Sequence, residues 1–267
     1  MRVRVMNFGM MRPRIAGLFA PNLASVPCLC LLIEVGNELV LVDAGLGTQD
    51  IADPCRLGFS NILLNASRDP ELTAVRQLKR MGREPGEVTH IICTHLDRDH
   101  AGGLPDFPNA LVHVHPDERE AALRPPSPRE RERYRKCHFA HGPRWVTCET
   151  VSGEAWFGMD CFRELAGLPP ELVLIPLPGH TRGHCGVAVQ TGDGWLLHCG
   201  DAYYVKDELA GDSPVPFDIR CFRRVAHIDH SMAMLQVGRL RTALKDGNGT
   251  ISTVASHDRV EFEKLSG

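Results

Sequence analysis

Apolar residues in the first half of the chain fall into short runs that end at polar or glycine-containing segments. Two runs, Cys30–Val35 and Leu39–Asp43, flank the turn residues Gly36–Glu38 and predict a β-hairpin. The runs Val88–Thr94 and Leu111–His115 predict two further strands, of which the first is buried. This half of the chain therefore contributes several strands to a sheet.

Between these strands, the segment from Asp69 to Gly82 has apolar residues at three- and four-residue spacing, which predicts an amphipathic helix. Asp69 is the expected N-cap, Pro70 the first helical residue and Gly82 the C-terminal stop.

The second half repeats the alternation of strands and helices. A helix is expected over about 230–245, ended by Gly247. Four more strands are expected over Leu172–Leu177, Gly186–Thr191, Trp195–Cys199 and Ile251–Ser256. This alternation predicts one α/β domain over residues 1–267, with helices covering sheets.

A charged segment interrupts the pattern at about 117–165, and we interpret it as a helical insertion. Its first part, 117–135, is helix-prone but broken by Pro125, Pro126 and Pro128. A solvated pair of surface helices is favoured over a partner-binding arm. In an enzyme, such an insertion could also form a wall of the active-site cleft.

Composition and charge then limit the classes of binding partner that we expect. The chain is 43% hydrophobic, which suffices for a substantial core, and its net charge is −3 with both signs interspersed. We expect neither nucleic acid nor a membrane as a partner, and leave a homodimer open. The Cys28–Val35 run is too short for a membrane span or signal peptide. The ten cysteines form no small-domain framework, so we interpret them as reduced, mostly buried thiols of a cytoplasmic protein.

The candidate chemistry lies directly after the buried strand. Four residues with metal-ligating side chains fall within six positions, namely His95, Asp97, Asp99 and His100. In an extended chain alternate side chains point to one side, so the first three could converge, and His100 could join them once the chain turns. Imidazole and carboxylate ligands suit zinc, iron or manganese.

Three later strands also end in ligand-type residues. His180 follows Leu172–Leu177, Asp201 follows Trp195–Cys199, and His257 follows Ile251–Ser256. Ligands at the ends of separate strands can meet at one edge of a sandwich, where clefts form.

In these motifs the chain resembles the metallo-β-lactamase superfamily. The resemblance rests on Val42–Gly45, the His95–His100 cluster, Pro178–Thr181, Gly200-Asp201 and Ser256–Asp258, in the order typical of that family. It implies an αββα sandwich, with two mixed sheets flanked by helices. It says much less about the substrate, because this fold hosts many hydrolytic reactions.

The resemblance also implies the ligand set of two divalent cations. His95, Asp97 and His180 would hold the first cation, and Asp99, His100 and His257 the second, with Asp201 bridging both. Asp43 would orient these ligands from outside the site, and His184 would have a supporting rather than a ligating role.

One position departs from the family pattern. Asp97 stands where the family usually has a second histidine, as in some iron-binding relatives. A carboxylate moves the preference from zinc toward iron or manganese without excluding zinc. The alternative is that Asp97 does not ligate, so that the first site is weak or empty.

The resemblance further implies metal-activated attack of water on a carbonyl carbon. Asp99 would orient the nucleophile or move its proton, and Tyr204 would assist at the carbonyl or leaving group, as in the lactone-hydrolysing branch. Local packing is an equal alternative for Tyr204. His227–His230 mimics a metal motif, but we interpret it as the start of a helix capped by Asp229.

We therefore expect hydrolysis of a small carboxylic ester, above all a lactone such as an acyl-homoserine lactone. The alternatives are thioester hydrolysis of the glyoxalase II type and a non-hydrolytic, iron-binding redox module. β-Lactam and nucleic-acid hydrolysis are disfavoured, because a signal peptide and a strongly basic surface are not evident.

Overall fold

The computed structural model describes residues 1–14, 20–148, 155–211 and 214–266. Six strands form a first sheet in the order β1-β2-β3-β4-β5-β6. The strands are β1 (Arg2–Met11), β2 (Val26–Val35), β3 (Glu38–Val42), β4 (Val88–Ile92), β5 (Leu111–Val114) and β6 (Arg144–Thr147). β2 and β3 pair antiparallel across the predicted hairpin, whereas β3 to β6 are parallel neighbours, so the sheet is mixed.

The second sheet has four strands in the order β10-β9-β8-β7. They are β7 (Leu172–Pro176), β8 (Cys185–Thr191), β9 (Gly194–His198) and β10 (Ile251–Val254). β7, β8 and β9 are antiparallel neighbours and β10 is parallel to β9, so this sheet is also mixed.

The two sheets pack face to face because their strands are apolar on both sides. Along β2, Leu29, Leu31 and Ile33 pack in a cluster with Leu174 and Val187 of the second sheet. Alternate side chains of a strand point to opposite faces. The residues between them, among them Cys30 and Leu32, accordingly belong to a different cluster on the outer face.

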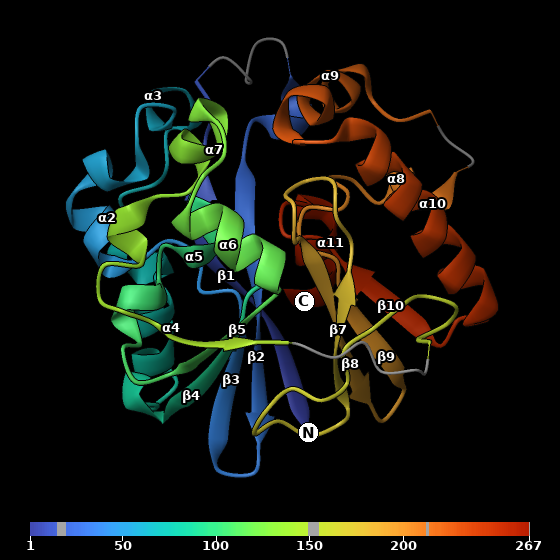
Figure 1. Ribbon diagram of the computed structural model, residues 1–267, viewed down its shortest axis with the longest axis horizontal. Coiled ribbons are helices and arrows are strands. Elements are labelled where there is room, and N and C mark those ends of the chain that lie inside the picture. Colours follow the sequence, from blue (N-terminus) through green and yellow to red (C-terminus); the bar gives the residue numbers. More distant parts are fainter. Residues whose placement is uncertain (15–19, 149–154, 212–213, 267) are drawn as a thin grey trace.

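Helices cover these outer faces. In Figure 1, α4, α5 and α6 lie beside the first sheet, and α8 and α10 lie beside the second. The described helices are α2 (Thr48–Ala52), α3 (Asn61–Leu64), α4 (Ala74–Arg80), α5 (Arg98–Ala101), α6 (Pro116–Leu123), α7 (Pro128–Arg133), α8 (Asp207–Ala210), α9 (Phe217–Ala226), α10 (His230–Asp246) and α11 (Arg259–Ser266). The predicted αββα arrangement is confirmed, with a core between the sheets and one under each helical layer.

The predicted helix between Asp69 and Gly82 is divided in two. Asp69 caps a 3₁₀ turn over Pro70–Leu72, and α4 begins only after Thr73. The reason is that Thr73 has an extended backbone and its hydroxyl accepts from the Arg76 N–H, so it acts as a second N-cap. Gly82 ends the helix with a positive φ of 73°, as expected.

The charged segment at 117–165 is helical only in part, and its residues 149–154 lie outside the described residues. Helices α6 and α7 occupy its beginning, but Arg144–Thr147 forms the edge strand β6, in which Trp145 and Val146 favour extended structure. Nor is the helix pair simply solvated, because Glu118 and Glu130 are buried.

Two further expectations concern the membrane and the cysteines. Among the described residues, no helix is both long and apolar enough to cross a bilayer. Seven of the ten cysteines are buried, which agrees with the predicted buried thiols.

Candidate metal centre

The candidate ligands gather at one edge of the sandwich because each lies in a segment that follows the end of a strand, with Asp99 and His100 on the short helix α5. The segment 95–100 follows β4, and His180, Asp201 and His257 follow β7, β9 and β10. Hydrogen bonds tie the sheets together at this edge: Cys185 N–H donates to Thr94 O (2.8 Å) and Leu29 N–H to Ser256 O (2.8 Å).

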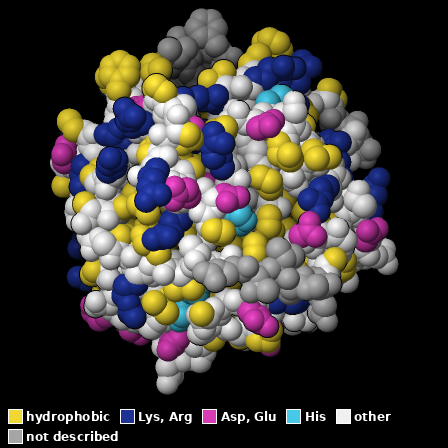
Figure 2. Space-filling model, viewed as in Figure 1, with side chains coloured by type: hydrophobic (Ala, Val, Ile, Leu, Met, Phe, Trp, Pro, Cys, Tyr) yellow, Lys and Arg dark blue, Asp and Glu magenta, His cyan; other side chains and the backbone are white. Residues whose placement is uncertain are grey.

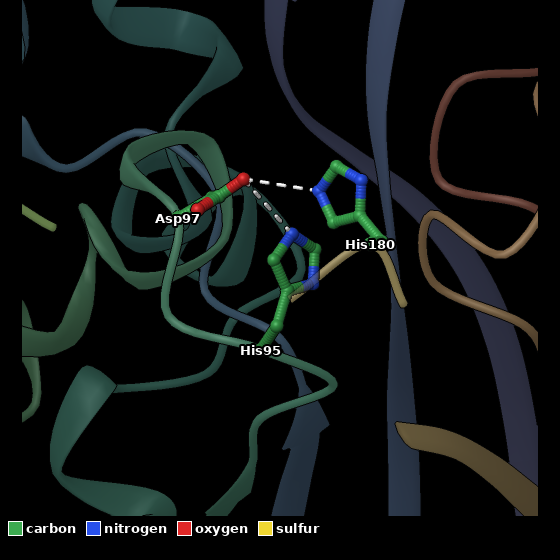
Figure 3. Close-up of side chains that lie close together, drawn as sticks. All are labelled: His95, Asp97 and His180. Carbon is green, nitrogen blue, oxygen red and sulfur yellow. Dashed lines mark hydrogen bonds and ion pairs between the residues drawn. The ribbon is translucent and has the colours of Figure 1, made fainter. Parts of the chain in front are cut away.

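Four histidines and three aspartates thus lie together, although they span more than 160 positions of sequence. Their donor atoms form three overlapping groups in which all donors lie within 4.8 Å of one another. The groups are His95 with Asp97 and His180; His95 with His100 and Asp201; and Asp99 with His100 and His257. Figure 3 shows the first group, with the Asp97 carboxylate facing both imidazoles.

The spacing of these donors suits tetrahedral coordination. Oδ2 of Asp97 lies 3.4 Å from His95 Nε2 and 3.1 Å from His180 Nε2. Oδ2 of Asp201 lies 3.5 Å from His180 Nε2 and 3.2 Å from His257 Nε2. Donors about 2.0–2.2 Å from a tetrahedral zinc ion lie about 3.3–3.6 Å from one another, so these separations resemble the edges of a coordination polyhedron.

Asp201 is the residue that reaches all parts of the cluster. Besides the contacts of its Oδ2, its Oδ1 lies 3.3 Å from His100 Nε2. The carboxylate thereby faces histidines from both proposed cation positions, which is the arrangement required of a bridging ligand.

The imidazoles are oriented by hydrogen bonds from outside the cluster. Nδ1 of His100 donates to Asp43 (2.8 Å), and Nδ1 of His257 donates to the Pro27 carbonyl (2.7 Å). Nδ1 of His95 lies 2.9 Å from the Thr94 hydroxyl, which itself donates to Asp43 (2.7 Å). Since Nδ1 is engaged in each case, Nε2 faces the centre, as is usual for histidines that bind metals.

Asp43 thus orients two of the predicted ligand histidines, His100 directly and His95 through the Thr94 hydroxyl. It is fully buried, and its φ of 59° lies in the left-handed region that aspartate tolerates better than most residues. Its carboxylate also accepts from the Thr94 N–H (2.7 Å), so it fixes the start of the ligand loop.

Unpaired buried atoms indicate that a cation fits among these side chains. Within the described part of the chain, Nε2 of His95, Nε2 of His100, Oδ1 of Asp97 and Oδ1 of Asp201 are buried without a hydrogen-bond partner. Buried polar atoms are nearly always paired in folded proteins. Imidazole and carboxylate donors with unsatisfied lone pairs are suited to divalent cations.

The electrostatics of the cluster are dominated by its carboxylates. Burial lowers the pKa of His257, but Asp201 and Asp99 outweigh this effect and raise the pKa to about 10. The pKa of Asp99 is lowered to about 2, because His100 and His257 outweigh the effect of burial. A cation that binds Nε2 must replace these protons, so binding competes with protonation.

His184 lies beside the cluster but outside the three donor groups. Its Nδ1 donates to the Leu177 carbonyl (2.9 Å), and its Nε2 accepts from the Asp201 N–H (2.9 Å). It therefore contacts Asp201 through the backbone, and its supporting role stays a prediction. Burial lowers the pKa of His184 well below its usual range, so it accepts this bond as a neutral imidazole.

Tyr204 lies at the centre as well. It is buried, and its hydroxyl is 3.2 Å from Nδ1 of His180, while its ring stacks on His257. Burial and the nearby Asp201 raise the pKa of Tyr204 well above its usual range, so the phenol keeps its proton.

Two residues close to the cluster are not among the predicted ones. Asp229 caps α10 as expected, but the adjacent His227 is buried with its Nδ1 3.2 Å from Nδ1 of His180. The motif-like spacing of residues 227–230 is the sequence signal for His227, so the interpretation of this segment as a helix start alone is incomplete. Arg133 contacts Asp97 (2.7 Å), and no sequence signal separates it from the other arginines of the charged segment.

A cavity of about 520 Å³ opens onto the cluster. Its lining includes Asp97, Asp99, His180, Asp201, Tyr204 and His257 at the polar end. The remaining surface is largely apolar and includes Met11, Leu23, Val26, Leu63, Leu64 and Phe222. The polar side chains in this part of the lining are Ser60, Arg98, Arg129, Glu132 and Arg133.

A two-sheet αββα sandwich with histidines and aspartates at one edge defines a metal-binding protein of a known architecture. The chain belongs to the metallo-β-lactamase superfamily, whose family model matches residues 24–245. The predicted resemblance is confirmed, and with it the binding of divalent cations as a property of the family.

Relatives agree with this assignment. The chain is 40% identical to a probable metallo-hydrolase of Mycobacterium tuberculosis over 86% of its own length and 74% of the relative's. It is 29% identical to an N-acyl homoserine lactonase of Bacillus thuringiensis, over 84% and 79% of the two lengths. A crystal structure of a quorum-quenching N-acyl homoserine lactone lactonase superposes with a TM-score of 0.70 at 25% identity, covering 98% and 94% of the chains.

Proposed function

We propose that this protein is a metal-dependent hydrolase of carboxylic esters, and that its substrate is a lactone bearing an apolar chain. The observation that carries the proposal is the cavity, whose polar end is the donor cluster and whose remaining surface is largely apolar. Its volume of about 520 Å³ is in the range of sites for small organic molecules.

The two ends of the cavity suit the two ends of such a substrate. An ester or lactone group has two oxygens that accept interactions, the carbonyl oxygen and the alkoxy oxygen, which suits the polar end. Transfer of an aliphatic chain from water to contact with Leu23, Leu63 and Phe222 lowers the free energy of the complex. An acyl-homoserine lactone combines both features, and so does any lactone with an alkyl substituent.

Two divalent cations would be held by the donor groups described above, with Asp201 between them. Bound there, they supply Lewis acidity, which polarises a carbonyl and lowers the pKa of water from about 16 toward roughly 7. We propose zinc first, with iron or manganese as alternatives because Asp97 adds a hard oxygen donor.

The protein's own groups orient the reaction. Asp99 lines the cavity, and its Oδ2 lies 3.3 Å from His257 Nε2. It is placed to hold a water molecule by accepting its hydrogen bond and to take up its proton. Tyr204 faces the same cavity with a protonated hydroxyl, which suits it to donate to the carbonyl or leaving oxygen.

The relatives support the same substrate class. The relative from Bacillus thuringiensis is named an N-acyl homoserine lactonase, and it is similar to this chain over 230 residues. The more similar mycobacterial relative is named only a probable metallo-hydrolase, so the choice of lactone depends on the cavity and on assay.

The test begins with elemental analysis of the purified protein and continues with a panel of lactones, glutathione thioesters and phosphodiesters. We expect alkyl-substituted lactones to be opened fastest. Asp99→Asn should lower this rate by at least about 10²-fold, the size typical of a lost acid–base group. Asp193→Asn, an exposed position in the β8–β9 turn, is the matched control and should retain full rate. A metal-loaded enzyme that opens no lactone would falsify the proposal. Turnover of the thioesters instead would assign the protein to thioester hydrolysis.

Replacing Tyr204 with phenylalanine should lower kcat for lactone opening roughly 10²-fold, the usual effect of removing one donor to a developing oxyanion. KM and metal content should change little, because the ring remains and its hydroxyl is not in the donor groups. Steady-state kinetics with elemental analysis measures both.

The adjacent tyrosine provides the control for this prediction. Tyr203 is equally buried, but its hydroxyl donates to Glu261 (2.9 Å) and it does not line the cavity. Tyr203→Phe should therefore leave kcat unchanged and affect only stability. An unchanged kcat in Tyr204→Phe would assign that residue to packing alone.

A further inference from the structure

Arg133 makes direct contact with two atoms of the first donor group. Its Nη1 lies 2.7 Å from Asp97 Oδ2 and 2.9 Å from His180 Nε2. These are the atoms that face each other in Figure 3 and that would bind the first cation. The arginine side chain is only 13% exposed, so it belongs to the interior of the site.

The position of this guanidinium is fixed by the packing of α7 on α9. Nη2 of Arg133 donates to the Ala226 carbonyl at the C-terminal end of α9. One turn earlier on α7, Arg129 donates to the carbonyls of Val225 and His227. Two arginines therefore hold the same helix end, which favours positive charge. Figure 2 shows lysine and arginine side chains gathered over this part of the face, with acidic side chains among them.

The donor group of Asp99, His100 and His257 has different surroundings. Carboxylate oxygens of Asp99 and Asp201 lie 3.2 to 3.7 Å from Nε2 of His100 and His257. A divalent cation can displace protons from imidazoles. It cannot deprotonate a guanidinium, which keeps its charge at all accessible pH values.

We propose that Arg133 competes with a cation for Asp97 and His180, so that the two donor groups bind divalent metals with unequal affinity. This rests on the proposed function, because it assumes the donor groups named there. The group around Asp99, His100 and His257 binds first and tightly. The group around His95, Asp97 and His180 binds weakly, and only after Arg133 withdraws.

Two physical effects produce this inequality. Nε2 of His180 has a single lone pair, which either accepts the Arg133 N–H or binds a cation. A fixed positive charge a few ångströms from a dication also repels it strongly where water is largely excluded. Loading of the first position is thereby coupled to the contact between α7 and α9.

The experiment is a titration of the metal-free protein with Co²⁺, followed by equilibrium dialysis with elemental analysis and by visible absorption. We expect the wild-type protein to bind two equivalents whose dissociation constants differ at least tenfold. In Arg133→Met the weaker equivalent should tighten at least tenfold while the stronger one changes little. Magnetic coupling between the two Co²⁺ ions should then appear at lower total cobalt.

The control is Arg131→Met, which removes an exposed arginine from the same helix and leaves the contacts of α7 with the end of α9 in place. It should titrate like the wild-type protein. If Arg133→Met folds poorly, Arg133→Lys gives the second test, because lysine keeps the charge but cannot present the planar fork of donors. It should give an intermediate affinity for the weaker equivalent.

Two equivalents of equal affinity in the wild-type protein would overturn the proposal, as would an Arg133→Met titration identical to wild type. Since no substrate is used, these results are independent of which ester the enzyme hydrolyses. A protein that binds no divalent cation in any variant would instead remove the basis of the proposed function itself.

Discussion

Asp201→Asn is expected to abolish the hydrolytic activity while leaving the fold intact. Its carboxylate faces His100, His180 and His257, and asparagine keeps the size but removes the negative charge that would hold two cations together. Loss of several kcal/mol of transition-state stabilisation corresponds to a rate at least about 10³-fold lower.

Metal-dependent stabilisation provides an independent measurement for this variant. A ligand that binds only the folded state raises the unfolding temperature, by an amount set by its affinity. Zinc should therefore raise the Tm of the wild-type protein after removal by a chelator, and raise that of Asp201→Asn much less. Asp207→Asn removes the same charge from an exposed position a few residues away, and this variant should behave like wild type. Full metal content in Asp201→Asn with activity within tenfold of wild type would contradict the bridging role.

The sequence was sufficient to place the seven candidate ligands at one edge because each of them lies in a short segment that follows an apolar strand. A strand end is a local feature, and parallel or layered strands bring their ends together. The same reasoning explains why Asp43 could be assigned a supporting position after the first hairpin. These residues are predictable because their neighbours in sequence fix their place in space.

Local competition between capping groups explains where the prediction of elements was wrong. The spacing of apolar residues continues smoothly from Leu72 to Met81, but the Thr73 hydroxyl offers the backbone a second starting point. Periodicity alone does not reveal which of two adjacent caps begins the helix. Similarly, the charge of the 117–165 segment concealed the short apolar strand around Trp145.

Arg133 and His227 could not have been found from local sequence, because they approach the site from elements far from the ligand loops. Arg133 comes from the end of α7, and its side chain resembles those of four neighbouring arginines in every sequence property. Only the packing of α7 against α9 selects it for contact with Asp97 and His180. The sequence had left open whether the first site is weak, and this contact is the physical reason to expect that it is.

Glu118 also approaches the site from an element far from the ligand loops. We expect its replacement to affect both the stability of the fold and the affinity for metal. It lies on α6 with no exposed surface, and its carboxylate accepts from the N–H groups of Leu96 (2.9 Å) and Gly183 (3.1 Å). Leu96 lies between two candidate ligands, and Gly183 belongs to the loop after His180. One carboxylate therefore connects both ligand loops to the same helix.

The close approach of these loops depends on Gly183. A Cβ at this position would lie 2.3 Å from the Glu118 nitrogen, so only glycine allows the helix to pack here. Burial raises the pKa of Glu118, which shows that the buried charge has a desolvation cost. The two N–H donors offset that cost as long as the carboxylate is present.

Glu118→Ala should therefore lower the free energy of unfolding by about 2–5 kcal/mol, because two buried N–H groups lose their acceptor. It should also weaken metal binding roughly 10–100-fold, the usual effect of losing a group that orients ligands. Glu118→Gln retains one acceptor oxygen and should fall between alanine and wild type in both measurements.

Urea unfolding of the metal-free protein and a zinc titration measure the two effects separately. Glu120→Ala is the matched control, since it removes an exposed glutamate from the same helix and should change stability by no more than about 0.5 kcal/mol. If Glu118→Ala lost stability but bound metal as tightly as wild type, the carboxylate would support the fold without positioning the ligand loops. Only a loss of both would show that α6 sets the geometry of the metal centre.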